Sequence, residues 1–394
     1  MNKFIILIMF SLLVACTKKQ DVETFNPENT IRIEFDKQHS GFLDEIEDVN
    51  IIPLKFTDDF ILSSFQIQLR INNDYMYFFD RNQKKMYVFD KNGDFKFLIN
   101  KYGNGPEGYI QPSNFFISNN LDIYIFDKAQ KKLLIFNKNG NYIKNLRIDC
   151  PASNVTYLND STFIAYAQTA AYFEKSKDGI KILDKSGKIT NSFLHMPSWI
   201  SNSAMSFATG SYFIYQNETP LLITPWNNRI YSIYADSVGC KYSLDFGKFN
   251  IPHSFFQENE DRMKDINTIQ KMKDNGWVFF IDFLQESTSH VSFNLQKKSE
   301  SYIALYSKKT RKNKLMSFSS MPTKWLGILN PFLCTYNDAF YTLVSVDRLE
   351  LLLDDVDNND ARLAKIRNQF GKYKKEREGN LHSDDLVLLS FRFK

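Results

Sequence analysis

The sequence predicts an all-β fold built from repeated units, and two observations support this prediction. Aromatic residues make up 15% of the 394-residue chain, and aromatic side chains favour strands, where their rings pack on a pleated surface. A hairpin motif also recurs, with its glycine at Gly93, Gly140 and Gly187, two steps of 47 residues each. Two equal intervals indicate an internal structural repeat.

Each copy of the motif has the letters of a tight hairpin: FDKNGDF at 89–95, FNKNGNY at 136–142 and LDKSGKI at 183–189. An apolar residue ends one strand, polar residues and a glycine with positive φ form the turn, and an apolar residue starts the next strand. Strands ending at Asp80 and Asp127 precede the first two copies, again 47 residues apart. A period of roughly 40 to 50 residues with several short strands is typical of a propeller blade.

Weaker copies continue the pattern at 230–239, 302–316 and 339–344. The count gives about six units, so we expect a six-bladed β-propeller of four-stranded antiparallel blades. Because an open sheet edge promotes aggregation, the ring must close. We expect the alternating segment 31–35 to complete the last blade beside 386–391.

Two segments between strands have helical rather than alternating spacing. Apolar residues lie three apart between 257 and 273, and similar steps occur between 357 and 375. We predict two short helical insertions that cap a blade, the alternative being a lid that faces a partner. The acidic run 354–360 lacks the glycine and glutamate of a calcium loop and fits the first turn of the second helix better.

The N-terminal residues differ in character from the rest of the chain. The apolar run 4–15 is too short to span a bilayer and has the form of a secretory signal. It ends in Leu-Val-Ala-Cys, which resembles a lipobox, so Cys16 is the expected acylated residue. We therefore expect a signal peptide at 1–15, a lipidated tether at 16–29 and the propeller at 30–394. The expected location is the cell envelope, anchored in the outer membrane and facing the periplasm or the exterior.

Composition and motif spacing exclude several classes of function. The net charge of +4 is small and scattered through turns, so no nucleic-acid partner is expected. Neither a HExxH motif nor a CxxC motif occurs, and no metal, cofactor or catalytic residue is predicted. Three cysteines remain in the mature chain, an odd number that implies no disulfide framework, although one pair stays open: Cys150, Cys240 and Cys334.

The candidate ligand-binding segment is KYGNGPEGYIQ at 101–111, which leads from the outer strand of one blade to the inner strand of the next. Such connections carry binding residues in many folds. The candidate residues are Tyr102, Asn104, Glu107, Tyr109 and Gln111. The tyrosines offer flat faces to a sugar or peptide, whereas the alternative is an inter-blade turn whose glycines serve backbone geometry alone.

Two further sets of residues have competing interpretations. Asp80 and Asp127 either accept hydrogen bonds from their own turn amides, which we favour, or converge on a calcium ion. The four tryptophans are either core residues, which we favour, or sugar platforms: Trp199, Trp226, Trp277 and Trp325.

The 47-residue unit, the KNG hairpins and the segment GNGPEGY at 103–109 together resemble the six-bladed β-propeller lipoproteins of Bacteroidetes, relatives of NHL-type propellers. Members of that family usually read GxGPGEY, so the glycine and glutamate are exchanged here and no fixed role is carried over to Glu107. The resemblance implies an envelope-anchored propeller, often linked to glycan or nutrient uptake.

These observations predict a non-catalytic binding or assembly module with a glycan, peptide or protein partner. The alternative is a carbohydrate-active propeller enzyme, a glycosidase or lyase. An enzyme of that kind would gather two carboxylates or a histidine at the mouth of the central channel.

Overall fold

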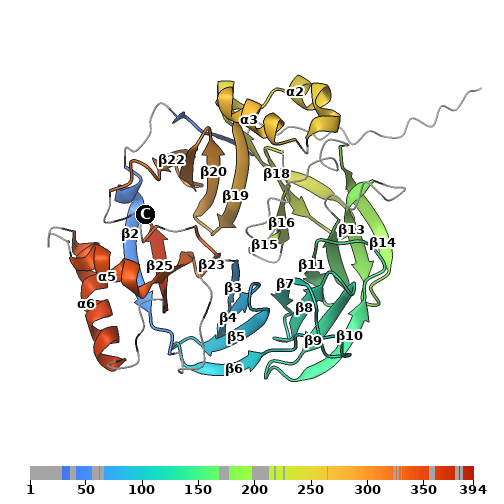
Figure 1. Cartoon of the computed structure of the whole chain (residues 1–394), viewed down its shortest axis with the longest axis horizontal. Coiled ribbons are helices and arrows are strands. Elements are labelled where there is room, and N and C mark those ends of the chain that lie inside the picture. Colours follow the sequence, from blue (N-terminus) through green and yellow to red (C-terminus); the bar gives the residue numbers. More distant parts are fainter. Residues whose placement is uncertain are drawn as a thin grey trace, which may run out of the picture.

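The computed structural model describes residues 29–35, 41–55, 62, 66–167, 177–197, 213–216, 219–224, 227–263, 265–322, 325, 328–329, 331–354, 360–377, 381 and 385–394. Six sheets are arranged as blades around a central axis (Figure 1). The predicted six-bladed propeller with four-stranded antiparallel blades is confirmed. Cys16, the predicted signal peptide and nearly all of the predicted tether lie outside the described residues.

The first three blades follow one another along the chain, each from its inner to its outer strand (Figure 1). Blade one contains β3 (Ile67–Ile71), β4 (Tyr75–Asp80), β5 (Lys85–Asp90) and β6 (Phe95–Ile99). Blade two contains β7 (Pro112–Ile117), β8 (Ile123–Asp127), β9 (Lys132–Phe136) and β10 (Tyr142–Arg147). Blade three contains β11 (Asn154–Asn159), β12 (Thr162–Tyr166), β13 (Asp178–Asp184) and β14 (Ile189–His195).

Blades four and six each include one strand from the N-terminal part of the chain, whereas blade five is formed by four consecutive strands. Blade four contains β15 (Phe213–Gln216), β16 (Thr219–Ile223), β17 (Arg229–Ile233), β18 (Val238–Asp245) and the added β1 (Thr30–Arg32). Blade five contains β19 (Val278–Glu286), β20 (His290–Lys297), β21 (Glu300–Ser307) and β22 (Lys312–Ser317). Blade six contains β23 (Cys334–Tyr336), β24 (Ala339–Ser345), β25 (Leu386–Phe393) and β2 (Ile46–Ile52).

In the repeated hairpin, one short polar side chain organises the turn, which explains why the motif recurs in the sequence. In all three copies the residue before the Lys accepts hydrogen bonds at Oδ1 from two backbone amides, at positions two and four residues ahead. The distances are 2.9 and 3.1 Å for Asp90, 3.0 and 3.0 Å for Asn137, and 2.8 and 3.1 Å for Asp184. These are Asx-type turns, in which a short polar side chain replaces part of the backbone hydrogen bonding.

The glycine of the motif is required both by its own backbone and by the neighbouring blade. Gly93 and Gly140 both have φ of +80°, which disfavours any residue with a Cβ. A Cβ at Gly93 would lie 1.6 Å from the carbonyl oxygen of Pro53, just after β2. At Gly140 it would lie 2.6 Å from the Phe97 ring of blade one. The repeated glycine therefore marks a contact between consecutive blades.

The ring closes differently from the expectation. The outer strand of blade six is β2, which pairs antiparallel with β25, for example Val49 with Phe391. The predicted closing segment 31–35 instead begins in β1, which pairs parallel with β18, Ile31 opposite Leu244. Segment 31–35 alternates cleanly, whereas in 46–52 Glu47 and Asp48 are adjacent and the pairing register shifts between Ile46 and Asp48, so clean alternation alone favoured the wrong segment. Phe35 fixes the outcome, because its ring packs edge-on against Phe249 at 5.1 Å, beside blade four.

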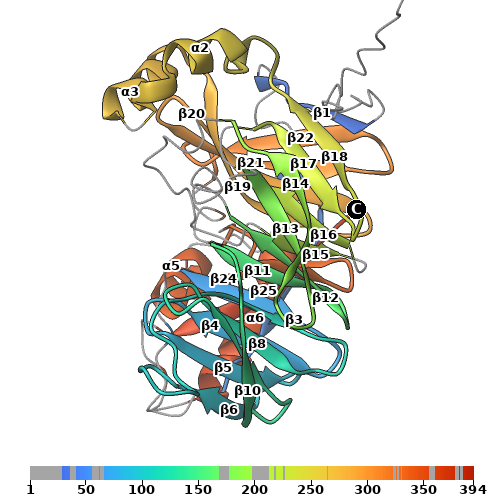
Figure 2. The ribbon, with the colours of Figure 1, turned by 90° about the vertical axis from the view of Figure 1, so that its right-hand side faces the viewer.

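Helical insertions occur between strands as predicted, but they are more divided than expected. The first consists of α2 (His253–Glu258), a 3₁₀ turn and α3 (Ile266–Asp274), which stand out from the rim (Figures 1 and 2). The break occurs because Asp265 is extended and caps α3, accepting a bond from the Asn267 amide at 3.0 Å. The second consists of α5 (Val346–Asp354), which was not predicted, and α6 (Ala361–Glu376), capped by Asp360.

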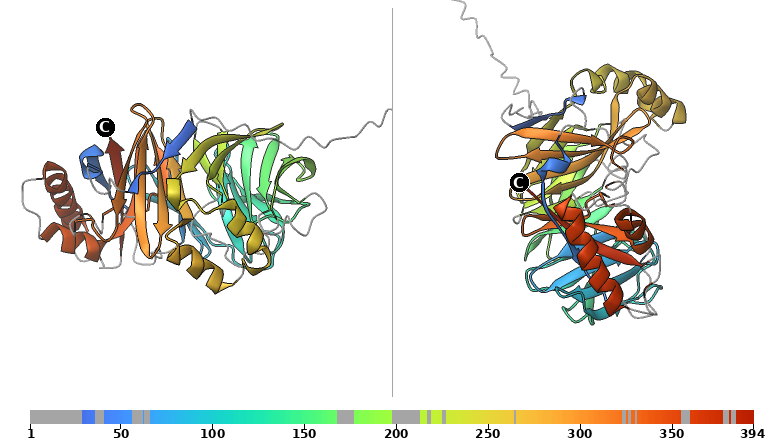
Figure 3. Two further views of the ribbon diagram at one scale, coloured as in Figure 1. Left: turned by 90° about the horizontal axis from the view of Figure 1, so that it is seen from above. Right: turned by 90° about the vertical axis from the view of Figure 1, so that its left-hand side faces the viewer.

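Helix α6 lies along the outer edge of β2 (Figure 3). The side chain of Gln369 accepts a bond from the Ile51 amide at 2.9 Å, and Lys365 pairs with Asp48 at 2.5 Å. The Tyr373 hydroxyl donates to the carbonyl of Leu54 at 3.2 Å. An exposed edge strand can recruit another chain, and this helix covers that edge.

The cores lie between the faces of adjacent blades, and two of the tryptophans belong to apolar clusters. Trp325 is buried between blades five and six, and Trp277 packs on Phe255 at 5.1 Å beside α2. Trp199 and Trp226 lie outside the described residues. Cysteines 150, 240 and 334 are all free thiols. Within the described ranges, no helix combines the length and apolar character needed to cross a membrane.

Candidate functional site

The predicted ligand-binding segment 101–111 connects β6 to β7, and the buried side chain of Tyr109 anchors it to blade one. This side chain is fully buried, and its hydroxyl donates to the Lys84 carbonyl at 2.6 Å. The amide of Lys101 donates to the same hydroxyl at 3.2 Å. Burial raises the pKa of Tyr109 to about 12. Tyr109 thus anchors the segment and does not present a face to solvent.

The other four candidate side chains are exposed: Tyr102, Asn104, Glu107 and Gln111. The side chain of Tyr102 is 60% exposed, and the Lys84 ammonium lies 3.9 Å from its ring centroid. Such a cation over an aromatic face holds the ring in place. Glu107 forms an ion pair with Lys101 at 2.8 Å.

Asp127 fixes the end of this segment to blade two. Its carboxylate accepts bonds from the amides of Ile110 at 2.7 Å and Gln111 at 3.2 Å, and also from Ala129 in its own turn at 2.9 Å. The side chain of Asn145 on β10 donates to the Pro106 carbonyl at 3.1 Å. The segment is therefore a rigid connection. Its exposed tip is positioned by bonds on both sides.

Asp80 and Asp127 have the structural role that we favoured. Asp80 accepts a bond from the Gln83 amide at 2.9 Å, as Asp127 does from its own turn. Both carboxylates are fully buried at the ends of β4 and β8. Within the described residues no group of three or more potential metal ligands forms.

Side-chain amides join the inner strands of neighbouring blades around the ring. Gln68 donates to the Ser113 carbonyl at 3.1 Å, and Gln285 donates to the Leu333 carbonyl at 3.1 Å. Asn114 bonds the Val155 backbone twice, at 2.6 and 3.1 Å. Arg70 on β3 reaches the carbonyl of Phe213 at 3.3 Å, on the opposite blade (Figure 1). These polar groups are used to hold the ring together.

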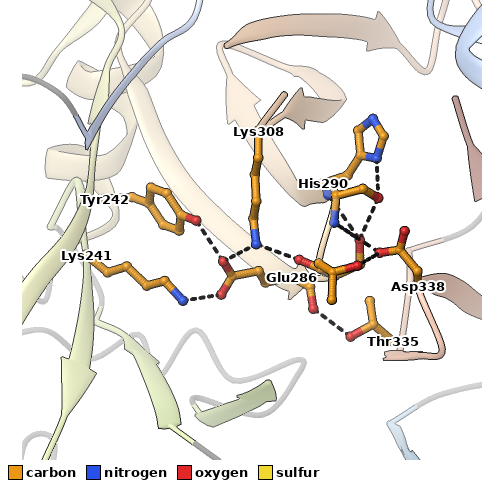
Figure 4. Close-up of polar contacts among 10 residues, drawn as sticks. Lys241, Tyr242, Glu286, His290, Lys308, Thr335 and Asp338 are labelled. Atoms are coloured by element: carbon orange, nitrogen blue, oxygen red, sulfur yellow. Dashed lines mark hydrogen bonds and ion pairs between the residues drawn. The ribbon is translucent and has the colours of Figure 1, made fainter. Parts of the chain in front are cut away.

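A second constellation, which the sequence did not reveal, surrounds Glu286 at the end of β19 (Figure 4). Its carboxylate is fully buried and lies 2.7 Å from the Lys241 ammonium and 2.6 Å from that of Lys308. The hydroxyl of Tyr242 donates to it at 2.7 Å. Lys241 and Tyr242 come from β18 and Lys308 follows β21, so the cluster joins blades four and five. The available signal was Glu286 at the end of a largely apolar strand that also contains Asp282 and Gln285.

In this Glu286 cluster the charge of the carboxylate is balanced by the two lysine ammonium groups. Burial lowers the pKa of Lys308, against the opposing effect of its bond to Glu286. Burial and the adjacent negative charge of Glu286 raise the pKa of Tyr242, so this hydroxyl stays protonated. Two ammonium groups face one carboxylate, and the lysine side chains are 31% and 25% exposed. Because two ammonium groups face one carboxylate, the cluster carries a net positive charge that can attract an anion. Both oxygens of Glu286 already have partners within the cluster.

The turn after Glu286 brings a serine, a histidine and an aspartate together without the order of contacts in a hydrolase. Ser289 Oγ lies 2.8 Å from His290 Nδ1. The carboxylate of Asp338 accepts bonds from Thr288 Oγ1 at 2.6 Å and the Ser289 amide at 3.0 Å. Nε2 of His290 is buried without a partner, and its ring packs on Phe393. In a catalytic triad the carboxylate would orient the histidine, which it does not do here.

Asp282 is a further buried carboxylate on β19. Its Oδ1 accepts a bond from the Phe283 amide at 2.7 Å, and Oδ2 has no partner. Burial raises the pKa of Asp282 to about 7. Phe283 has φ of +51° at a bulge in the strand, so the backbone here is strained.

Comparison with known proteins gives one family that spans most of the chain. A model of a domain of unknown function, DUF4934, matches residues 29–378. The chain belongs to the DUF4934 family. No curated protein matches the sequence of this DUF4934 propeller. The structure confirms the six-bladed propeller that the resemblance to Bacteroidetes lipoproteins implied. The lipid anchor that it also implied stays a prediction.

A solved structure shows the same fold in another chain. A crystal structure described as an exported protein from Bacteroides fragilis superposes with a TM-score of 0.75 at 20% identity, covering 93% of this DUF4934 chain and 99% of that one. A member of the DUF4221 family from Bacteroides vulgatus gives a TM-score of 0.46 at 12% identity, covering 88% and 98%. At these identities the likeness concerns the fold alone.

Proposed function

We propose that this propeller is a non-catalytic binding or assembly module, held at the outer membrane through an acylated Cys16. The observation that carries the proposal is the rigid 101–111 connection, which presents Tyr102 and Asn104 to solvent. Burial of Tyr109 and the bonds to Asp127 fix its backbone. A recognition surface on a loop held by a rigid scaffold loses little conformational entropy when a ligand binds.

The chemistry of this surface suits a glycan or a peptide. The Tyr102 ring supplies a flat apolar face, and its cationic neighbour Lys84 fixes its orientation. The Asn104 side chain can both donate and accept hydrogen bonds, as sugar hydroxyls and peptide groups require. Gly103 and Gly105 have open space where a Cβ would lie, so a ligand can approach the backbone closely.

The described carboxylates favour binding over catalysis. Glu286 is bound by two lysines and a tyrosine, and Asp338 is bound by hydroxyl and amide donors. Asp282 is buried and offers one unpartnered oxygen. A glycosidase needs two carboxyl groups on opposite sides of one bond. Glu286 and Asp338 are already engaged by these donors, so we infer that both serve structural roles.

The binding proposal is tested on the full chain with an array of neutral and acidic oligosaccharides and a tetrapeptide library. Tyr102→Ala and Asn104→Ala are each expected to weaken capture of the bound probe about tenfold. Tyr234→Ala is the matched control, since Tyr234 is an exposed tyrosine on blade four, after β17. Equal loss in Tyr234→Ala, or no loss in Tyr102→Ala, would contradict the assignment of the site.

The same probes distinguish a binding protein from an enzyme. We expect captured oligosaccharides to be recovered intact, without new reducing ends or the ultraviolet absorbance of a lyase product. Turnover that disappears in Glu286→Gln while the fold is retained would replace the binding proposal with the enzyme alternative.

A further inference from the structure

A cleft of 410 Å³ lies at the outer edge of blade four, between β1, the start of β17 and the end of β18. We call it the β1 cleft. Its volume falls in the range of small-molecule sites. It is separate from the 101–111 segment, which lies on blades one and two. Nothing in the proposed function depends on it.

The walls of the β1 cleft carry an excess of positive charge. Of the described lining residues, Arg32 and Arg229 are cationic and Asp245 alone is anionic. Arg32 Nε donates to Asp245 at 3.1 Å, while its side chain is 72% exposed. The planar guanidinium group offers several donors in a fork that matches a carboxylate. Arg32 can therefore keep its contact with Asp245 and still donate from its terminal nitrogens.

The carboxylate of Asp245 already accepts hydrogen bonds from three donors of the protein. The Gly247 amide donates to it at 2.9 Å and the Asn250 side chain at 3.0 Å, in addition to Arg32. The Gly247 bond contributes most to holding the pKa of Asp245 below its usual value. The carboxylate stays ionised and serves to position the donors around it.

The asparagines of the cleft are held in place before any ligand arrives. Asn228 donates to Asn250 at 2.9 Å, and Asn227 donates to the Tyr231 hydroxyl at 2.8 Å. Asn227 also accepts a bond from the Arg229 amide at 3.1 Å. Side-chain amides combine a donor and an acceptor, so they suit hydroxyl or amide groups next to the charge. Among the described residues that line the cleft there is no aromatic ring and one apolar residue, Leu244.

From this charge, size and polarity we propose that the β1 cleft binds a small carboxylate whose neighbouring atoms carry hydrogen-bonding groups. A sugar acid and the C-terminal end of a peptide share this chemistry. Because Arg32 belongs to β1, the ligand would also join this short strand to blade four. Binding therefore stabilises the docking of β1.

The proposal is tested by calorimetric titration of the full chain with D-galacturonate and, in a parallel experiment, with N-acetyl-dialanine. One of the two is expected to bind saturably below roughly 10 mM, and the arm that binds identifies the source of the carboxylate. Its methyl ester, which lacks the charge, is expected to bind at least about tenfold more weakly. Hydrogen exchange of the β1 amides should slow on binding.

Variants of the cleft provide the controls. Arg32→Ala and Asn228→Asp should each reduce affinity about tenfold or more, the second by placing a like charge beside the ligand. Arg147→Ala is matched to Arg32→Ala, because Arg147 is an exposed arginine with one carboxylate contact, to Asp149 at 3.7 Å, on another blade. It should leave affinity unchanged. The proposal fails if neither probe binds, if the ester binds equally well, if inorganic sulfate binds as tightly, or if Arg32→Ala has no effect in a folded protein.

Discussion

Replacing Asp282 by Asn should make the protein more stable, and increasingly so as the pH rises from about 4 to about 7. Asp282 is 6% exposed, and one of its carboxylate oxygens has no hydrogen-bond partner. Asn keeps the oxygen that accepts from the Phe283 amide and removes the charge. The change is nearly isosteric, so packing around the side chain should be preserved.

The magnitude follows from the pKa of Asp282, which burial raises from 3.8 to about 7. Between these values the folded protein keeps a proton that the unfolded chain releases. The free energy of unfolding of the wild type therefore falls as pH rises, by about 1.4 kcal/mol per pH unit from this group. The accumulated loss is about 4 kcal/mol near pH 7. It stays constant above that pH, since both states are then ionised.

The assay is urea unfolding of wild type and Asp282→Asn at several pH values between about 4 and 8. Other titrating groups cancel in the difference between the two proteins. Asp338→Asn serves as a control of opposite sign. Hydrogen bonds from Thr288, Ser287 and Ser289 outweigh the effect of burial and hold the pKa of Asp338 at about 2. That variant should lose stability relative to wild type as pH rises from about 2 to about 4, so in the assay it should show a constant deficit from about pH 4 to 8.

A stability difference between wild type and Asp282→Asn that does not change with pH would refute the reasoning. It would mean that Asp282 is ionised in the folded protein throughout this range, as it is in the unfolded chain. A difference that grows only below about pH 4 would indicate the same.

Three further changes test other features. Glu286→Gln leaves the ammonium groups of Lys241 and Lys308 without their counter-ion and should cost about 3 to 5 kcal/mol in a denaturant titration; an effect below about 1 kcal/mol would contradict the role of the cluster. Gly93→Ala must relieve a 1.6 Å approach to the Pro53 carbonyl and a strained φ, so thermal unfolding should occur several degrees lower, whereas Gly239→Ala, with open space around it, should not clash. Deleting the side-chain bond of Gln369 with Ala should speed hydrogen exchange at the Ile51 amide, and unchanged exchange would show that α6 does not protect this edge.

Much of the fold could be predicted from the sequence because one blade is repeated with its turn chemistry intact. Asp90, Asn137 and Asp184 accept the same pair of amide bonds, so the repeat in letters is a repeat in geometry. The choice of closing strand was less accessible. Segment 31–35 alternates more cleanly than 46–52, yet long-range partners such as Phe249 place it beside blade four.

The candidate sites also differ in how far they could be predicted from the sequence. The 101–111 segment was visible because its glycines and tyrosines are adjacent in sequence. The Glu286 cluster was not, since Lys241 and Lys308 lie 45 and 22 residues away from Glu286 and meet it only when blades four and five pack. Burial of Tyr109 likewise depends on Lys84, from another turn.

The separate placement of β1 and β2 has a mechanical consequence. The described fold begins at residue 29, so a pull on the chain from its N-terminal side reaches β1 first. That force acts on three residues paired with β18, together with the packing of Phe35. The seam between β2 and β25 lies further along the chain, and α6 covers the outer edge of β2. Tension would therefore separate β1 from blade four before any force reached the β2–β25 pairing that closes the ring.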